Sequence, residues 1–218
     1  MSYGKFETIE QVSDTFEIEI TRGAFINKEK IEIDPILLTM ISRRLLEDAN
    51  FVNEQAICQH IITPILDIVS DHHESLKVWS QVTYTVDKER DLDGEPDYLI
   101  APYAKNGGML TPPLCIMEAK QENWKKGWAQ ALAEMYAAST QGTKVCYAAV
   151  TTGVLWQFGK LEEGKLFTRD PIKLSAIDNL QGVLNTLNWL FGVVDKASKR
   201  RFNAIKLSQG EHAGSPLL

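Results

Sequence analysis

Two acidic residues and one lysine in this sequence have the types and the spacing that suit hydrolysis of a phosphodiester bond. Asp97 opens a predicted strand over residues 97–101, and Glu118 and Lys120 stand at the end of an apolar strand over residues 114–119. Side chains two residues apart on a strand point to the same face of the sheet, so Glu118 and Lys120 are expected to be neighbours. If the two strands pair, Asp97 lies beside them.

This grouping predicts a divalent cation. Two convergent carboxylates repel each other unless a positive charge lies between them. Oxygen ligands with open coordination positions suit Mg²⁺ or Mn²⁺, which keep bound waters and accept phosphate oxygens. A lysine beside the cation can orient or help deprotonate a water molecule, or offset charge that develops on the phosphorane. The three residues therefore predict metal-assisted attack of water on a phosphodiester.

The Glu-x-Lys spacing occurs twice and is not specific by itself. Glu163-Gly164-Lys165 repeats it, but that copy falls in a predicted hairpin turn and no Asp-bearing strand precedes it. We expect it to be a surface turn. The first copy differs because it ends a continuously apolar strand, and charges buried there without partners are costly.

The periodicity of apolar residues predicts the elements that must position the site. Asn53 suits the N-cap of one helix, and Pro64 inside that helix predicts a kink or a break. The predicted elements are short strands at 16–20 and 31–33, a helix at 36–48 with Pro35 at its first position, the helix after Asn53, strands at 78–86, 97–101 and 114–119, a helix at 128–139, strands at 144–150, 155–160 and 165–168, and a helix at 177–197.

The order of these elements predicts an α/β fold. The three consecutive strands with short links favour an antiparallel meander, in a mixed sheet that carries helices on its faces. We expect one domain over residues 1–207, with its core at about 53–160, and a flexible tail over 208–218.

The motifs and their order resemble the PD-(D/E)XK nuclease superfamily. The match runs from the helix after Asn53, through Pro96-Asp97 and Glu118-Ala119-Lys120, to a second helix and a strand ending near Thr152, which is less than half of the chain. It is nearest to the N-terminal nuclease-like domains of type I restriction enzyme R subunits. It implies a restriction-endonuclease-like mixed central sheet flanked by helices, here with an N-terminal strand and helix extension.

The resemblance also implies roles for the central residues. Asp97 and Glu118 match the metal ligands of the superfamily, and Lys120 matches its catalytic lysine. The backbone carbonyl of Ala119 matches a further metal ligand. The implied activity is Mg²⁺- or Mn²⁺-dependent cleavage of nucleic acid, with DNA as the expected partner.

Further site residues follow from the two helices. Glu54 matches a glutamate that many members carry on the first helix, although an acid near an N-cap is favoured by the helix dipole in any case. Gln130 matches a glutamine found on the helix after the lysine, and Tyr136 is a candidate for a tyrosine that follows it, at looser spacing. Gln130 and Glu134, four residues apart, could equally form a solvated face.

Two groups of basic residues are candidates for binding nucleic acid. In Trp124-Lys125-Lys126-Gly127-Trp128, cations alternate with aromatic side chains next to the predicted site, which suits contacts with phosphates and bases. The alternative is an amphipathic loop whose tryptophans pack in the core. A second cluster lies beyond the last predicted helix and either binds phosphates or complements the helix dipole; it comprises Lys196, Lys199, Arg200, Arg201 and Lys206.

Two rival functions are also compatible with the sequence. A binding or assembly protein could keep the same fold without cleaving nucleic acid, because a fold does not fix a function. A small-molecule enzyme on an unrelated α/β fold would place an apolar pocket away from Lys120. A cutter of both strands needs two sites, so a homodimer or a partner subunit of a larger system is plausible.

The amino-acid composition excludes further classes of protein. With 23 Lys and Arg against 29 Asp and Glu, the net charge of −6 excludes a binder that holds nucleic acid by bulk positive charge. No stretch reaches the length of an apolar membrane span, so we expect no membrane partner. An odd number of cysteines, 3, without zinc-site spacing predicts buried thiols in a reducing, cytoplasmic compartment.

Overall fold

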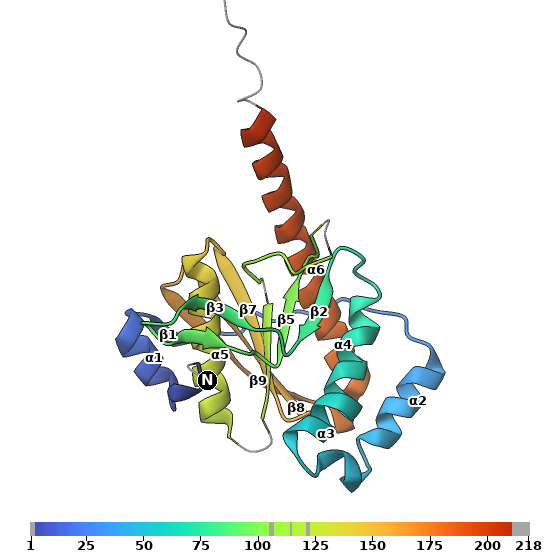
Figure 1. Ribbon diagram of the computed structural model, residues 1–218. Helices are drawn as coiled ribbons and strands as arrows, with labels where there is room; N and C mark the ends of the chain where they lie inside the picture. Colours follow the sequence, from blue (N-terminus) through green and yellow to red (C-terminus); the bar gives the residue numbers. More distant parts are fainter. Residues whose placement is uncertain (1–2, 105–106, 114, 121–122, 211–218) are drawn as a thin grey trace, which may run out of the picture.

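The computed structural model describes residues 3–104, 107–113, 115–120 and 123–210, with the side chains of residue 115 and residues 201–210 left outside the description. Within these residues the chain forms a mixed seven-stranded sheet with helices on both faces (Figure 1). The predicted α/β class, with a mixed central sheet flanked by helices, is confirmed.

The sheet pairs the first described strand with the last one, which precedes α6. Its order is β1 (Glu19–Arg22), β9 (Leu166–Ser175), β8 (Leu155–Glu162), β7 (Val145–Thr151), β6 (Cys115–Ala119), β5 (Tyr98–Ala101) and β2 (Lys77–Ser80). The β1–β9 and β6–β7 pairs are parallel, and the other pairs are antiparallel. The predicted antiparallel meander is therefore present as β2–β5–β6.

Helices bury one apolar core on each face of the sheet. On one face lie α1 (Ile9–Phe16) and α5 (Trp124–Thr140). On the other face lie α2 (Pro35–Arg44), α3 (Glu54–Ile57), the π-helical turn η3 (Cys58–Ile62), α4 (Thr63–Ser70) and α6 (Ala176–Gly210). The small ribbon of β3 (Tyr84–Asp87) and β4 (Leu92–Gly94) and the 3₁₀ turns η1 (Tyr3–Lys5) and η2 (Asp48–Phe51) complete the described elements.

The predicted N-terminal strands are wrong in two places. Residues 9–16 form α1, because Ile9, Val12 and Phe16 recur at helical spacing and bury one face against α5. Glu17, with a φ of 56°, ends this helix, so the strand begins only at Glu19. Residues 31–33 form no strand; the backbone N–H of Ile31 donates to Asn185 Oδ1 of α6 instead.

The helix after Asn53 is confirmed, and so is the break near Pro64. Asn53 Oδ1 accepts a hydrogen bond from the Ala56 N–H, as an N-cap does. Pro64 has no N–H for the carbonyl of His60, and the turn before it is π-helical. Arg44 Nη1 donates to that His60 carbonyl at 3.2 Å from α2, which itself ends at Arg44, earlier than predicted.

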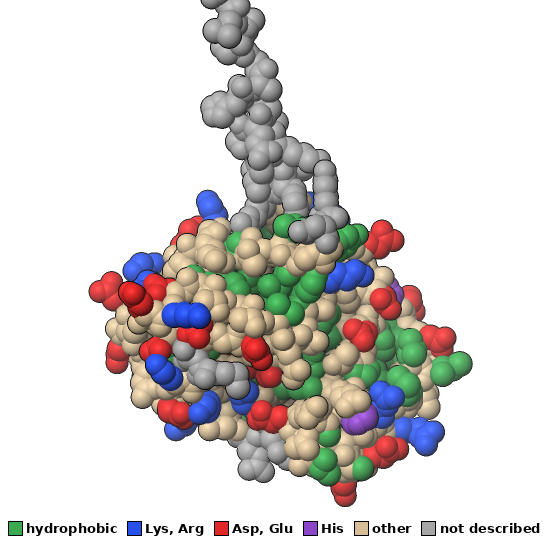
Figure 2. All heavy atoms as spheres, in the orientation of Figure 1, with side chains coloured by type: hydrophobic (Ala, Val, Ile, Leu, Met, Phe, Trp, Pro, Cys, Tyr) green, Lys and Arg blue, Asp and Glu red, His purple; other side chains and the backbone are tan. Residues whose placement is uncertain are grey.

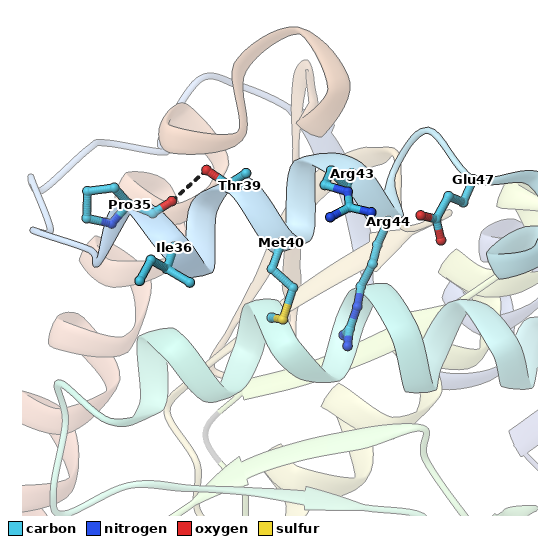
Figure 3. Close-up of a pocket in the computed structure, with 7 residues that line it drawn as sticks. All are labelled: Pro35, Ile36, Thr39, Met40, Arg43, Arg44 and Glu47. Carbon is cyan, nitrogen blue, oxygen red and sulfur yellow. Dashed lines mark hydrogen bonds between the residues drawn. The ribbon is translucent and has the colours of Figure 1, made fainter.

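Figure 3 shows how α2 presents its side chains. Arg44 points from α2 toward the helix below it, whereas Arg43 lies on the outer side of the same turn. A groove of about 530 Å³ runs along α2, lined by Pro35, Ile36, Thr39, Met40, Arg43, Arg44 and Glu47. Figure 2 shows that hydrophobic side chains over α2 are exposed, and Ile36 is one of them.

Three other predicted boundaries move. The strand predicted at 78–86 splits at Gln81, whose φ of 52° breaks the extended backbone. Helix α5 begins at Trp124 and not at residue 128, with Asn123 as its N-cap. Helix α6 continues to Gly210, with a break at Asn179, so the second basic cluster lies within the helix and not beyond it. Of the predicted tail, residues 208–210 are helical and 211–218 lie outside the described residues.

Candidate active site

Lys120 lies at the centre of a cluster of carboxylates from three parts of the chain. Its Nζ is 3.4 Å from Glu118 Oε2, 3.6 Å from Asp97 Oδ2 and 3.9 Å from Glu54 Oε2. The structure therefore brings together Asp97, Glu118, Lys120 and Glu54. We call these four residues, with Glu134, the carboxylate cluster.

Strand pairing explains why Asp97 reaches this place. Tyr98 pairs with Met117 across β5 and β6, and one more residue along the same register brings Asp97 opposite Glu118. Asp97 Oδ2 accepts a 2.8 Å hydrogen bond from the N–H of Ala119, which fixes the carboxylate beside the end of β6. Asp97 thus joins the two strands and contacts Lys120.

Glu118 is buried at the floor of the cluster. Its side chain is 0% exposed, against 26% for Asp97 and 50% for Glu54. Neither of its carboxyl oxygens has a hydrogen-bond partner within the described part of the chain. Burial, with the charges of Glu134 and Asp97, raises the pKa of Glu118 well above its ordinary value.

Glu134 is a member of the cluster that sequence reasoning missed. It is fully buried on α5, and its carboxyl group lies within hydrogen-bonding reach of Glu118 when one of the two carries a proton. Burial raises the pKa of Glu134 to about 8. A proton shared between the two buried acids would relieve the repulsion between their charges. The signal available in the sequence was an acid inside the Ala-rich, uniformly apolar stretch of this helix.

Gln130 acts on the cluster through Glu134. Its Nε2 donates to Glu134 Oε1 at 3.2 Å, one helical turn away. The predicted site residue is thus adjacent to the cluster, whereas Tyr136 is not. Tyr136 stacks on Phe16 and accepts a hydrogen bond from Arg90, on the far side of α5.

The position of Lys120 depends on a helical glycine. A Cβ at Gly127 would lie 2.8 Å from Lys120 Cγ and 2.9 Å from Val150 Cγ1. Because Gly127 has no Cβ, the first turn of α5 can pack directly against Lys120. Burial opposes the charge of Lys120, but Glu118, Asp97 and Glu54 outweigh burial and raise the pKa above the ordinary value. Lys120 is therefore an ammonium ion at neutral pH.

The donor set fits a hard divalent cation in its chemistry. Both oxygens of buried Glu118 lack a hydrogen-bond donor among the described residues, and partly exposed Asp97 lies beside them. Such oxygens suit Mg²⁺ or Mn²⁺. Lys120 contacts both of these carboxylates in the structure. Among the described residues, no group of three His, Cys, Asp or Glu side chains has the geometry of a metal site. Asp97 and Glu118 are the residues that could hold the ion.

The cluster opens to solvent on the side of Asp97. A cavity of about 210 Å³ borders this residue, and its other lining side chains are mostly polar: Gln55, Cys58, Gln59, Thr63, Ser80, Gln81 and Tyr98. The larger groove along α2 contains none of the cluster residues. Asp97 is the one member of the carboxylate cluster that lines this cavity, and its Oδ2 lies 3.6 Å from Lys120 Nζ.

The predicted basic residues are placed at opposite ends of the molecule. Lys125 and Lys126 begin α5 near the carboxylate cluster, and Lys126 Nζ pairs with Glu7 Oε1 at 2.7 Å. Lys199 and Arg200 are exposed on the C-terminal half of α6, which projects away from the start of α5 (Figure 1). Lys199 pairs with Asp195, and the side chain of Arg201 lies outside the described residues.

The second Glu-x-Lys copy lies at a turn, as expected. Glu163, with a φ of 50°, and Gly164 connect β8 to β9. Lys165 is 66% exposed and pairs at 3.8 Å with Glu17. It offers a natural control for Lys120.

No helix in the described part of the chain combines the length and apolar character that a bilayer span requires.

No protein-family model and no curated protein matches the chain. Among solved structures, a chain in the cryo-electron microscopy structure of the DrdV–DNA complex is similar, with 14% identity and a TM-score of 0.38. The match covers 73% of this chain but only 14% of that one. Similarity at this level establishes neither a shared family nor a shared function.

Proposed function

We propose that this protein is a divalent-metal-dependent nuclease of the PD-(D/E)XK type that hydrolyses phosphodiester bonds of DNA. The observation that carries the proposal is the position of Lys120, within 3.4 to 3.9 Å of three carboxylates beside a solvent-accessible cavity. Asp97 and Glu118 would hold the cation, together with the backbone carbonyl of Ala119. The bound cation would supply positive charge that polarises the scissile phosphate.

The chain's own side chains then bind and orient the substrate. Lys120 is a charged donor, so its ammonium group binds a non-bridging phosphate oxygen or positions the attacking water. Glu54 Oε2 lies 3.9 Å from Lys120 Nζ and its side chain is half exposed, which suits orientation of that water. Gln130 fixes Glu134, and Glu134 sets the protonation of Glu118.

A cleavage assay tests the proposal directly. Purified protein is incubated with plasmid and linear DNA in Mg²⁺ or Mn²⁺, beside D97A, K120A and the exposed-lysine control K165A. We expect D97A and K120A to lower the rate at least about 100-fold, since each removes a group that stabilises transition-state charge. K165A should cut like the parent protein. Metal-dependent cutting that survives both D97A and K120A would mean that the site is wrong.

A second candidate is a protein that binds nucleic acid, or assembles with a partner, without cleaving it. The buried pair of Glu118 and Glu134 favours this candidate, because a shared proton can neutralise Glu118 with no cation present. It predicts salt-sensitive DNA binding in the same assay buffer and no product with either metal ion.

A further inference from the structure

A basic pocket lies on the same face of the sheet as the carboxylate cluster, at the start of α5. Its volume is about 270 Å³, and it is lined by Arg22, Trp124, Lys125, Trp128, Gln157, Arg169, Pro171 and Lys173. The lining comes from β1, α5, β8 and β9, which are distant in sequence and meet only in the folded chain.

The cations of this pocket outnumber the acids near them, of which Glu10 acts on Arg169 and Lys125 without forming an ion pair. Four of its lining residues are cations, and no carboxylate of the described chain lies within ion-pair distance of any of them. Burial, and then the charge of Arg22, lower the pKa of Arg169; Glu10 opposes that effect. Two guanidinium groups held this near each other favour an anion between them.

The walls of the pocket are fixed before any ligand arrives. Lys173 Nζ lies 3.8 Å from the centre of the Trp124 ring, in a cation–π contact. Gln157 is held at both ends: its Oε1 accepts from Trp128 Nε1 at 3.0 Å, and its Nε2 donates to the Asp170 carbonyl at 3.1 Å. Arg22, Lys125 and Lys173 are exposed at the rim, so a ligand can reach them.

The register of the sheet places this pocket in line with the carboxylate cluster. Glu118 pairs with Val150, Val150 with Gln157, and Gln157 with Lys173. Directly paired residues point to the same face, here the face covered by α5. Three strand spacings separate Glu118 from Lys173, or about 14 Å at about 4.8 Å each. Adjacent phosphates of one DNA strand rise about 3.4 Å along the helix axis, so this span corresponds to a few nucleotides.

We propose that the basic pocket is a phosphate subsite that binds the backbone of the nucleic-acid strand a few nucleotides from the bond at Lys120. This inference rests on the proposed function, since it takes its substrate class from that function. The phosphate oxygens are bound by the guanidinium groups of Arg22 and Arg169 and by the ammonium groups of Lys125 and Lys173. The subsite sets the register of the strand across α5.

Binding and cutting are measured separately to test the subsite. A fluorescein-labelled DNA duplex is titrated with protein in EDTA, at several KCl concentrations, and its anisotropy gives the affinity. The R22Q/K173Q variant is compared with K28Q/K165Q, which removes the same charge from exposed positions elsewhere. We expect R22Q/K173Q to bind about 10-fold more weakly and to lower the salt slope by about 1 to 2, as lost phosphate contacts do.

The control variant should retain the parent affinity within about 3-fold, because loss of bulk charge alone acts weakly at a distance. Equal effects in both variants, or no DNA binding by the parent protein, would overturn the subsite. Inorganic phosphate titrated into the parent protein and followed by calorimetry separates a free-anion site from a strand site. Loss of phosphate binding in R22Q/K173Q, with duplex affinity unchanged, would also overturn it. Binding without any cutting would refute the nuclease proposal and leave the subsite standing.

Discussion

At the scale of single residues, Lys120 is surrounded by more negative charge than it can neutralise. Four carboxyl groups act on one ammonium group: Glu118, Asp97, Glu54 and, behind Glu118, Glu134. Burial makes that imbalance costly, so it is relieved by a proton on the buried acids. A divalent cation at Glu118 would relieve the same imbalance. A proton and the proposed cation would therefore compete for the same carboxylate.

The raised pKa values predict that the protein loses stability as pH rises. Unfolded glutamate titrates near 4.5, whereas Glu134 in the folded protein titrates at about 8. Between these values the folded state binds more protons than the unfolded state, so the free energy of unfolding falls with pH, by up to about 1.4 kcal/mol per unit for each proton. The loss is complete above about pH 8. Urea unfolding at pH 5, 6.5 and 8 measures it.

Glu134→Gln serves as the variant for this experiment. Glutamine keeps the size and the partner Gln130 but cannot ionise, so E134Q should flatten the fall in stability between pH 5 and 8. E162Q, at a partly exposed glutamate paired with Lys160, is the matched control and should keep the slope of the parent protein. An equally steep fall in E134Q would refute the shared proton.

At the scale of elements, two helices contain a residue that lowers their own helical stability but permits a tertiary contact. Gly127 lies inside α5, where glycine is less favourable than alanine by about 0.5 to 1 kcal/mol. That cost is explained by the close approach of α5 to Lys120. Pro64 removes a backbone donor from the helix after Asn53, and Arg44 of α2 satisfies the freed carbonyl.

Gly127→Ala is expected to destabilise the protein although alanine favours helices. The new methyl group meets Lys120 and Val150 at less than 3.0 Å, and overpacking of this kind costs about 1 to 3 kcal/mol. Displacement of Lys120 should also lower DNA cleavage. G192A in α6 is the control, since its Cβ meets only ordinary contacts at 3.5 Å or more; it should be neutral or stabilising by up to about 1 kcal/mol. Equal free energies of unfolding for both variants would contradict the packing argument.

Arg44→Met tests the link between α2 and the π-helical turn. It removes the donor to the His60 carbonyl while keeping most of the side-chain volume. We expect a loss of about 1 to 2 kcal/mol in the free energy of unfolding, from a lost hydrogen bond and a carbonyl left unpaired. Arg43→Met, at the exposed neighbouring position, should change stability by less than about 0.5 kcal/mol. Denaturant titration of the two variants compares them.

At the scale of the whole molecule, the sheet places the carboxylate cluster and the basic pocket on the same face. The cluster forms at the ends of β5 and β6, and the pocket forms across β8, β9 and β1. Helix α5 covers both, with Glu134 over the one and Lys125 beside the other. A net charge of −6 is compatible with a local basic pocket, because short-range charge and not the total decides where a phosphate binds.

Divalent ions should stabilise the folded molecule through the cluster. An ion at ten times its dissociation constant adds about 1.4 kcal/mol, which raises the unfolding temperature by about 3 to 6 °C for a chain of this size. Mn²⁺ and Mg²⁺ are titrated in thermal unfolding of the parent protein and of D97N. In D97N, neither Mn²⁺ nor Mg²⁺ should raise the unfolding temperature. A shift of the same size in D97N would place the ion elsewhere.

The sequence by itself predicted the class of the fold and the meeting of Asp97, Glu118 and Lys120 at one place. Period-two and helical spacing are local properties, so they predicted the meander, the helix after Asn53 and the break at Pro64. The register of two adjacent strands is short-range as well, and it was enough to place Asp97 beside Glu118. The predictions failed where local signals were ambiguous: the last residue of α1, Phe16, was assigned to the following strand, and Gly127 was assigned to the segment before α5.

Only the tertiary structure decided which groups surround the predicted ones. Glu134 could have faced solvent or the sheet, because helix periodicity does not say what a helix packs against. The basic pocket draws Arg22 and Arg169 from strands more than a hundred residues apart, and their pairing is a long-range contact that no local pattern encodes. The physical reason is the same in both cases. Burial and charge at a site depend on packing between elements, whereas sequence periodicity reports only the preference of each element by itself.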